Sequence, residues 1–451
     1  MSTERELIYD LLKGTLRMRE QGEKWLPKEP KERPDQYTRR LQRAILFGGL
    51  HGAMKRLTDL PFSKEVSLNK ELPTSLTEMQ WNLDYAGSSL TDFARRLFWD
   101  ALGYGHTHYY VDYPRSPGPT LADEEGARPY FVQVPAMSVL DWKSERTNVG
   151  ERLTEIQFAF TRNKEQFIRT LRPGYWSEAR AKDKTVVEEG EVLIAGKLAT
   201  SIPWRTVSFE PDGFMEATPP LIDLAWLNLA HWQSAADHRN YLRFIRIGVL
   251  TAFGFNEEDV EKIVISPNAL ISSANENAKI GYVEHGGSAY EAGVKDLERL
   301  EAHMEALGVQ PLIERTARST ATGRSLDENS RQSSAQRWVR TLEHGLNEGF
   351  ALAYAFKGLD PDPELAVNIF SDFEVGGSQS DAALLREMHR DMQISHATLI
   401  QELKRRGLLN EGVESAKELE AIAQEILNVS EHSGARSSDL PSGDVSTSDS
   451  A

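Results

Sequence analysis

Cysteine is absent from the 451-residue sequence. Its absence excludes disulfides, thiolate metal sites, iron–sulfur clusters and cysteine nucleophiles together, and it is compatible with a reducing compartment. Long hydrophobic runs are also missing: the first residues contain no apolar run of signal-peptide length, and no stretch of about 18 apolar residues occurs. The sequence therefore predicts neither secretion nor a membrane span.

Common catalytic motifs are lacking as well. The sequence contains no phosphate loop, dinucleotide fingerprint, HExxH pair or GxSxG nucleophile turn. The glycines in GYGHTH precede a predicted strand, whereas a nucleotide-binding turn follows a strand and opens a helix. No motif therefore indicates a nucleotide or another cofactor, and we expect none.

Positive charge is scarce relative to negative charge. Lys and Arg total 52 against 68 Asp and Glu, a net charge of -16 at pH 7. Because phosphate binding relies on Lys and Arg to displace counterions, this balance disfavours a protein that binds nucleic acid over its whole surface. The hydrophobic content of 40% is ordinary for a globular protein, and the length favours two or more structural units.

The first half predicts an α+β fold. Apolar residues over Asp35–Leu60 follow one helical face, and a second helix is expected after Ser88 and Ser89, ending at Gly103 or Gly105. THYYVDYP reads as a strand that Pro114 ends. Short alternating segments over residues 153–198 predict an antiparallel sheet with hairpin turns.

The second half predicts long helices. About 24 residues after Pro219 and Pro220 contain no Gly or Pro, enough for roughly 36 Å of helix. Residues 247–290 predict strands and a short helix, and a second helix follows with one apolar stripe (Val294, Leu297, Leu300, Met304, Leu307) and with Glu298, Glu301 and Glu305 off that stripe. Further predictions are a helix over Leu326–Lys357, a strand over Val367–Val375, helices after residue 380 and disorder beyond Glu431.

The segment ERTARSTATGRS, residues 314–325, is basic and hydroxyl-rich in this acidic chain. Its arginine and hydroxyl side chains are suitable donors to phosphate: Arg315, Thr316, Arg318, Ser319, Thr320 and Arg324. Composition alone favours a solvated surface loop. A loop of this length inside a compact domain is unusual, however, and prompts a functional explanation.

Two groups of residues admit a metal-site interpretation. His106, His108 and Asp112 project from one face of the predicted strand, as metal ligands would, but we favour two histidines on the polar face of a half-buried strand. Glu257, Glu258, Asp259 and Glu261 lack the alternating ligands and the glycine of a calcium loop. These acidic residues instead indicate a solvated helix start.

Several long stretches carry a resemblance to a known family. They include LDYAGSSLTDFARRLFWDALGYGHTHYYVDYP, PPLIDLAWLNLAHWQSAADHRNYL, YVEHGGSAYEAGVKDLERLEAHMEALG and TATGRSLDENSRQSSAQRWVRTLEHGLNEGF. In these stretches the chain resembles the portal-like proteins of tailed bacteriophages known as the DUF4055 family, over roughly residues 5–430. Gly323 and Arg324 depart from the small or acidic residues expected there, so the charge of this loop belongs to this chain.

The resemblance implies a portal fold assembled as a ring, typically a dodecamer. Its parts would be a wing at 1–216 and 325–379, stem helices at 217–246 and 291–308, a clip at 247–290, a tunnel loop at 309–324, a crown at 380–430 and a disordered tail at 431–451. Such a ring occupies one capsid vertex of the virion, after assembly in the host cytoplasm. It would contact the large terminase, a head–tail adaptor, and the major capsid and scaffolding proteins, without a membrane.

In that setting the residues acquire expected roles. Glu298, Glu301 and Glu305 would line the channel and repel the duplex, and the 314–325 segment would make transient, sequence-independent phosphate contacts. Glu257, Glu258, Asp259 and Glu261 would face the terminase or adaptor. We therefore predict a non-enzymatic conduit for double-stranded DNA. The alternatives are another head or head–tail structural protein and a metal-dependent hydrolase or nuclease that uses His106, His108 and Asp112.

Overall fold

The computed structural model describes residues 2–114, 126–148, 150–247, 249–255, 275, 277–283, 288–312, 333–371, 386–391, 394–395 and 397–400. The chain divides into two compact units, Met1–Ser371 and Asp372–Ala451. In the second unit the described residues form short helical segments at 386–390 and 397–400, within the region expected to be helical. Among the described residues, no helix has the length and hydropathy needed to cross a membrane.

The first unit begins with four helices: α1 (Thr3–Lys13), α2 (Thr15–Gln21), α3 (Pro34–Arg43) and α4 (Gly49–Asp59). The single helix predicted over Asp35–Leu60 is therefore wrong. Ala44 adopts an extended conformation, its carbonyl accepts two hydrogen bonds from the Arg19 guanidinium, and Gly48 and Gly49 follow. Because glycine disfavours a helix interior and the Ala44 carbonyl is used outside the helix, the chain turns there, and Ile45 is left exposed.

Helix α5 (Leu90–Tyr104) confirms its prediction at both ends. The Ser89 hydroxyl accepts a hydrogen bond from the Asp92 backbone N–H, and Gly105 ends the helix in the left-handed conformation with φ of 89°. A Cβ on Gly105 would also lie 2.7 Å from the Thr218 carbonyl oxygen. Both the left-handed conformation and this close approach therefore exclude a larger residue. Seven apolar side chains of the helix are buried: Leu90, Phe93, Ala94, Leu97, Phe98, Ala101 and Leu102.

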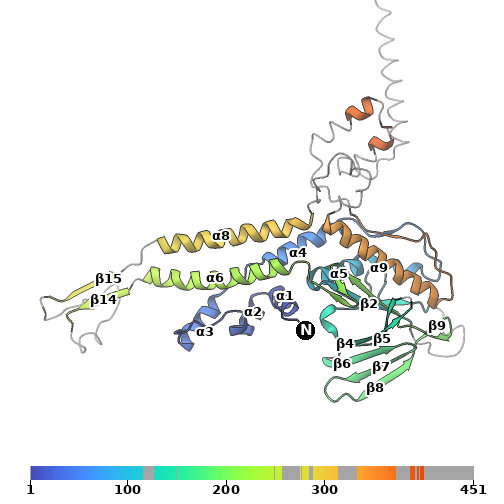
Figure 1. Cartoon of the computed structure of the whole chain (residues 1–451), viewed down its shortest axis with the longest axis horizontal. Helices are drawn as coiled ribbons and strands as arrows, with labels where there is room; N and C mark the ends of the chain where they lie inside the picture. The colour runs from blue at the N-terminus through green and yellow to red at the C-terminus, as the bar shows by residue number, and fades with distance from the viewer. Residues whose placement is uncertain are drawn as a thin grey trace, which may run out of the picture. The chain divides into compact units, whose positions relative to one another are not determined.

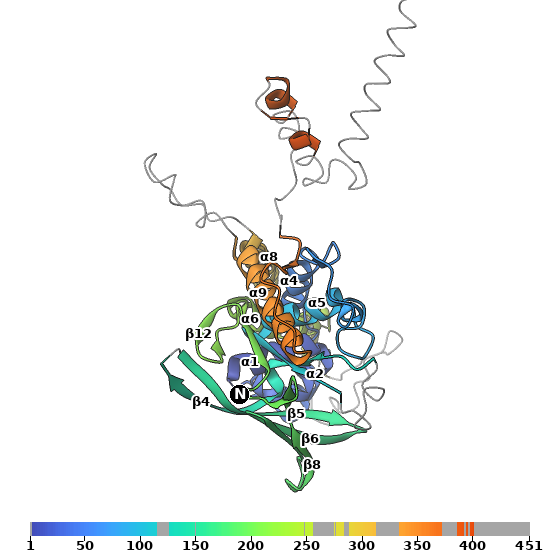
Figure 2. The same cartoon turned by 90° about the vertical axis from the view of Figure 1, so that its right-hand side faces the viewer.

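Two antiparallel sheets follow (Figures 1 and 2). In the first, β2 (His106–Asp112) lies between β11 (Trp204–Ser208) and β3 (Tyr130–Val134). The second has the order β4-β5-β6-β7-β8 and confirms the hairpin sheet predicted over 153–198; its strands are β4 (Val139–Thr147), β5 (Gly150–Arg162), β6 (Glu165–Arg172), β7 (Tyr175–Arg180) and β8 (Val186–Glu191). The buried side chains between the sheets include Tyr110, Ile156, Phe158 and Trp204.

Three two-stranded pairs complete the strands of this part: β9 (Leu193–Ile194) with β10 (Lys197–Leu198), β12 (Pro211–Gly213) with β13 (Glu216–Ala217), and β1 (Ser67–Leu68) with β16 (Val367–Asn368). Strand β16 is shorter than the predicted 367–375: residues 369–371 are not strand, and 372–375 lie outside the described residues. The Glu343 carboxylate accepts the Ile369 backbone N–H, so a helix side chain replaces a strand partner at that position.

Helix α9 (Ser334–Phe356) packs against the first sheet through aromatic rings. Phe93, Tyr109, Phe131 and Phe350 are fully buried, with ring centroids of 5.1 to 5.9 Å between contacting pairs. A Cβ on Gly349 would lie 2.4 Å from the Tyr109 hydroxyl, so glycine permits this close packing. The Ser333 side chain caps α9, and the start predicted at Leu326 lies outside the described residues.

Candidate functional site

Two long helices run antiparallel beside each other, α6 (Ile222–Ile247) and α8 (Ser288–Val309). Strands β14 (Val249–Phe253) and β15 (Lys279–Val283) form an antiparallel hairpin at the ends where the two helices connect (Figure 1). We call α6 and α8 the helix pair. This arrangement confirms both long helices and strands at the two ends of 247–290, whereas the rest of that range, including the predicted short helix, lies outside the described residues.

Polar contacts join the two helices along their length. His231 Nε2 lies 3.0 Å from Glu301 Oε1, and the Ser234 hydroxyl donates to Asp296 Oδ2 at 2.7 Å. Further along, the rings of His238 and Tyr290 stack with centroids 5.2 Å apart. A Cβ on Gly293 would lie 2.5 Å from His238 Nδ1, so the helices approach closely there. The pair is thus aligned by side-chain pairs as well as by apolar contact.

The helix pair packs on α4 near the start of α6 and near the end of α8. On α8, Met304 is buried and a Cβ on Gly49 of α4 would lie 2.9 Å from its sulfur; likewise a Cβ on Gly308 would lie 3.0 Å from the Ala53 Cβ. On α6, the Asn228 side chain accepts the Leu50 backbone N–H and donates to the Phe47 carbonyl. By contrast, none of the described side chains of α8 before Met304 is buried, although Val294, Leu297 and Leu300 are partly covered.

The three glutamates predicted from the sequence share one surface. Glu298, Glu301 and Glu305 line a groove of about 480 Å³ between α8 and the start of α4, together with Arg56 and the glycines Gly48, Gly49 and Gly52. All three are exposed, and the described residues offer an ion-pair partner only to Glu301, through His231. The groove is therefore acidic and open to solvent.

A basic surface that the sequence did not predict lies on and beside α3. A groove of about 880 Å³ between α3 and α6 is lined by six cations and three carboxylates: Lys31, Arg33, Arg39, Arg40, Arg43, Arg243, Glu29, Glu32 and Asp237. Lys31, Arg43 and Arg243 form no ion pair within the part of the chain that the structure describes, and Arg33 and Arg39 share the exposed Asp35. We call these five residues the α3 basic surface. The density of arginine in PDQYTRRLQR was a signal that could have revealed it.

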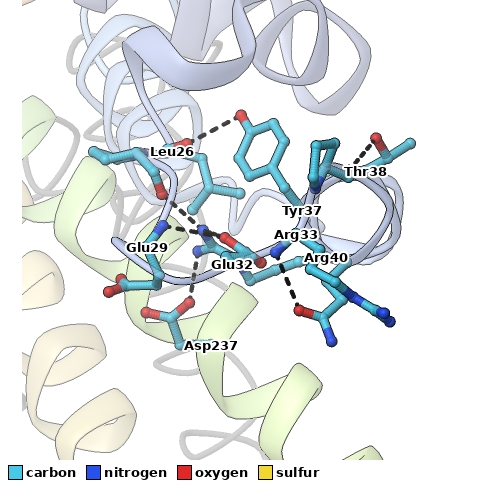
Figure 3. Close-up of polar contacts among 11 residues, drawn as sticks. Leu26, Glu29, Glu32, Arg33, Tyr37, Thr38, Arg40 and Asp237 are labelled. Atoms are coloured by element: carbon cyan, nitrogen blue, oxygen red, sulfur yellow. Dashed lines mark hydrogen bonds and ion pairs between the residues drawn. The ribbon is translucent and has the colours of Figure 1, made fainter.

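Arg40 holds this surface together from beneath (Figure 3). Its guanidinium is buried, donates to both Glu32 carboxylate oxygens at 3.0 and 2.8 Å and to Asp237 of α6 at 2.7 Å, and also reaches the Pro27 carbonyl. The Arg40 hydrogen bond lowers the pKa of Glu32. Arg40 therefore forms structural ion pairs, one of which joins α3 to α6. The exposed cations around it are the groups available to a partner.

The histidine pair on β2 lies in the core rather than on a polar face. His106 and His108 are both buried, with rings 4.7 Å apart, and His108 Nδ1 lies 3.0 Å from the Thr206 hydroxyl. Burial, with a smaller effect of Arg5, lowers the pKa of His106 to about 4, and burial also lowers the pKa of His108. Asp112 lies at the end of the strand, with its carboxylate 3.4 Å from Arg169 and 3.2 Å from the Tyr130 hydroxyl.

This arrangement does not favour the metal-site interpretation. Within the described ranges, no group of three or more His, Cys, Asp or Glu side chains is placed to hold a metal ion. Asp112 is engaged by Arg169, a cation that opposes metal binding, so the three residues are not a common ligand set. The expected half-buried polar face is also wrong, because β11 and Trp204 cover the histidines.

Two sets of predicted residues lie outside the described residues. They are the 314–325 set, Arg315, Thr316, Arg318, Ser319, Thr320 and Arg324, and the acidic set, Glu257, Glu258, Asp259 and Glu261. The described ends that flank the first set are Leu312 and Ser333. Their roles remain predictions.

Comparison with known proteins gives one match at the family level. Residues 220–357 match DUF4055, a domain of unknown function. The matched range contains the helix pair, the β14–β15 hairpin and α9. It confirms the expected likeness for that part of the chain, whereas the likeness was expected over roughly 5–430. No curated protein matches the chain.

Solved structures similar to the chain include parts of gene transfer agent (GTA) particles. The neck of an empty GTA particle, computed with C6 symmetry, has a TM-score of 0.42 and 8% identity, and the alignment covers 79% of this chain and 90% of that chain. A chain of the virion of a native GTA particle has a TM-score of 0.40 and 10% identity over 79% and 89% of the two chains. The neck of a native GTA particle, computed with C12 symmetry, has a TM-score of 0.38 and 9% identity over 79% of this chain and 89% of that chain.

Proposed function

We propose that the chain is the portal subunit of a tailed bacteriophage. Copies would form a ring at one capsid vertex, through which the large terminase pumps double-stranded DNA and through which the DNA later leaves. The observation that carries the proposal is the order helix, hairpin, helix, α9 within residues 220–357, the range of the DUF4055 match. The sequence resemblance implies this order as stem, clip, stem and wing helix.

The packing of the helix pair supports the ring. Val294, Leu297 and Leu300 on α8 are only partly covered within one copy, and Trp226 on α6 is 42% exposed. Each side chain gains free energy by leaving water, about 25 cal/mol for each Å² of apolar surface. In a cyclic ring, neighbouring copies would supply that cover through two different surfaces of each subunit.

The exposed acidic groups suit a conduit. Phosphates repel Glu298, Glu301 and Glu305, so a channel bordered by them holds a duplex weakly and lets it slide. The 314–325 segment would make the local phosphate contacts, and Glu257, Glu258, Asp259 and Glu261 would face the terminase or the head–tail adaptor. Capsid and scaffolding proteins would surround the ring during assembly.

Electron micrographs of the purified protein test this proposal. We expect closed rings with a central hole, and particles that stay monomeric at every concentration would contradict it. Replacing Arg315, Arg318 and Arg324 with Ala is expected to leave ring assembly unchanged and to impair DNA packaging. Wild-type packaging by that variant would remove the segment from the mechanism, whereas rings that do not bind the large terminase would favour another head or head–tail protein.

A further inference from the structure

The α3 basic surface concentrates positive charge on a chain whose net charge is -16. Its five cations (Lys31, Arg33, Arg39, Arg43, Arg243) are exposed, and the one carboxylate paired with two of them, Asp35, is itself exposed. Arg40 below them is already saturated by Glu32 and Asp237. The surface is thus held in shape by its own ion pairs and retains uncompensated positive charge toward solvent.

An acidic surface lies on α8. Glu291, Glu298, Glu301 and Glu305 are spaced by seven, three and four residues, which places them on one side of a helix with 3.6 residues per turn. All four are exposed. Lys295 and Arg299 lie beside them, and Lys295 is a helical neighbour of Glu291 and Glu298, four and three residues away. We call the four glutamates the α8 acidic flank.

The two surfaces lie on different sides of α6. Helix α3 packs on α6 through the Arg40–Asp237 pair, whereas α8 packs on it through His231, Ser234 and His238, and α6 lies between the other two helices in Figure 1. One copy therefore presents opposite charges on two separate surfaces. A head-to-tail contact between identical subunits requires two such different and complementary surfaces.

We infer that the α3 basic surface binds the α8 acidic flank of a second copy of this chain. The inference rests on the proposed ring and names the contact between its subunits, and it places Glu298, Glu301 and Glu305 in that contact instead of on the channel wall. A contact there would also cover Val294, which lies among the four glutamates on the helix surface and is partly exposed in one copy.

Charge reversal tests this contact with the full-length protein. One variant carries R33E, R39E and R43E, and a second carries E291K, E298K and E305K. Arg40 and Glu301 stay unchanged because they form internal pairs with Glu32 and Asp237, and with His231. A matched control carries R146E, K182E and K197E, three exposed cations of the β-strand region. Circular dichroism and thermal unfolding establish that each variant folds.

Ring formation is measured by analytical ultracentrifugation and micrographs at low and high salt. We expect each reversed variant to need at least tenfold more protein than wild type to form rings, and the control to assemble as wild type does. An equimolar mixture of the two reversed variants is expected to form rings again, because each acidic α3 then meets a basic α8 and each basic α3 meets an acidic α8. Salt is expected to weaken assembly of the wild type and of the mixture.

Three results would overturn the inference. Normal assembly of the R33E, R39E, R43E variant would remove α3 from the contact. Normal assembly of that variant with lost affinity for a linear DNA duplex would make the basic surface a nucleic-acid site instead. Failure of the mixture to form rings would exclude pairing with α8. A wild type that forms no ring at all contradicts the proposed function itself, and the inference with it.

Discussion

The packing around α5, β2, β3 and α9, which we call the aromatic body, contrasts with the helix pair. In the aromatic body Phe93, Tyr109, Phe131 and Phe350 are inaccessible to solvent. In the helix pair, α8 has no buried side chain among its described residues before Met304, and side-chain pairs such as His231–Glu301 align the helices. One region completes its core within a single chain, and the other leaves apolar and charged surface open.

This contrast indicates where stability and assembly reside. Burial of large aromatic side chains dominates the free energy of unfolding of a single subunit. Exposed charged residues on a half-covered helix contribute little to that free energy and are free to determine which surface a partner meets. Substitutions in the aromatic body should therefore change folding, and substitutions in the helix pair should change association.

The largest expected effect is that of Phe131→Ala. The side chain is fully buried against Phe93, Tyr109 and Phe350, so its removal leaves a cavity and should lower the free energy of unfolding by about 3–5 kcal/mol. Urea unfolding measures the change, with the exposed Val187→Ala as control. A loss below about 1 kcal/mol would show that the aromatic body is not the stabilising region.

Next is Arg40→Ala, at the junction of α3 and α6. The substitution leaves the buried Glu32 carboxylate without its cation, so we expect a loss of about 3 kcal/mol, whereas the exposed Arg39→Ala should lose less than about 0.5 kcal/mol. Thermal or urea unfolding of both variants compares them. Equal losses would contradict the assignment of Arg40 as the structural pair.

A pH effect of about 2 kcal/mol is expected from His106 alone, in the core of the aromatic body. The unfolded chain protonates His106 near pH 6.5, but burial holds its folded-state pKa at about 4, so unfolding takes up protons and stability falls from pH 7 to pH 5. His108 acts in the same direction, since burial lowers its pKa. Asp100 has the opposite effect on stability. Burial raises its pKa to about 6, so between pH 7 and pH 5 the folded state takes up a proton that the unfolded state does not, and stability rises.

His106→Phe should therefore reduce this acid sensitivity, measured as the difference in urea-unfolding free energy between pH 7 and pH 5. His344→Phe is the matched control, because the His344 side chain is 78% exposed. An unchanged pH dependence in His106→Phe would show that other groups cause the acid sensitivity.

The smallest effect on folding is expected for Leu300→Ala on α8. The side chain is half-buried in one copy, so we expect a loss of about 1 kcal/mol in the isolated subunit, together with a clear rise in the protein concentration needed for ring assembly. Unfolding and sedimentation measurements on the same preparation compare the two. A folding loss as large as that of Phe131→Ala would remove the contrast between the regions.

The sequence predicted local structure correctly where hydrophobic periodicity agreed with residues that begin or end a helix or strand. Ser89 and Gly105 mark the two ends of α5, as predicted, and α6 begins soon after Pro219 and Pro220. The alternating segments after Leu153 form the predicted hairpin sheet. It failed at Ala44, where a long-range hydrogen bond from Arg19 overrides a helical pattern. It also placed His106 and His108 on a polar face, because alternation along a strand does not reveal what covers each side.

By itself, the sequence determined which residues are helical or extended, which apolar stripe each long helix carries, and the acidity of the chain. The helical and extended segments and the apolar stripes depend on neighbours within a few turns, and the acidity depends on composition alone. Only the tertiary structure decided that Glu298, Glu301 and Glu305 border one groove with α4, and that arginines from α3 and α6 share a basic surface. Such groupings depend on contacts between residues about 200 positions apart, such as Arg40 with Asp237, which no local pattern encodes.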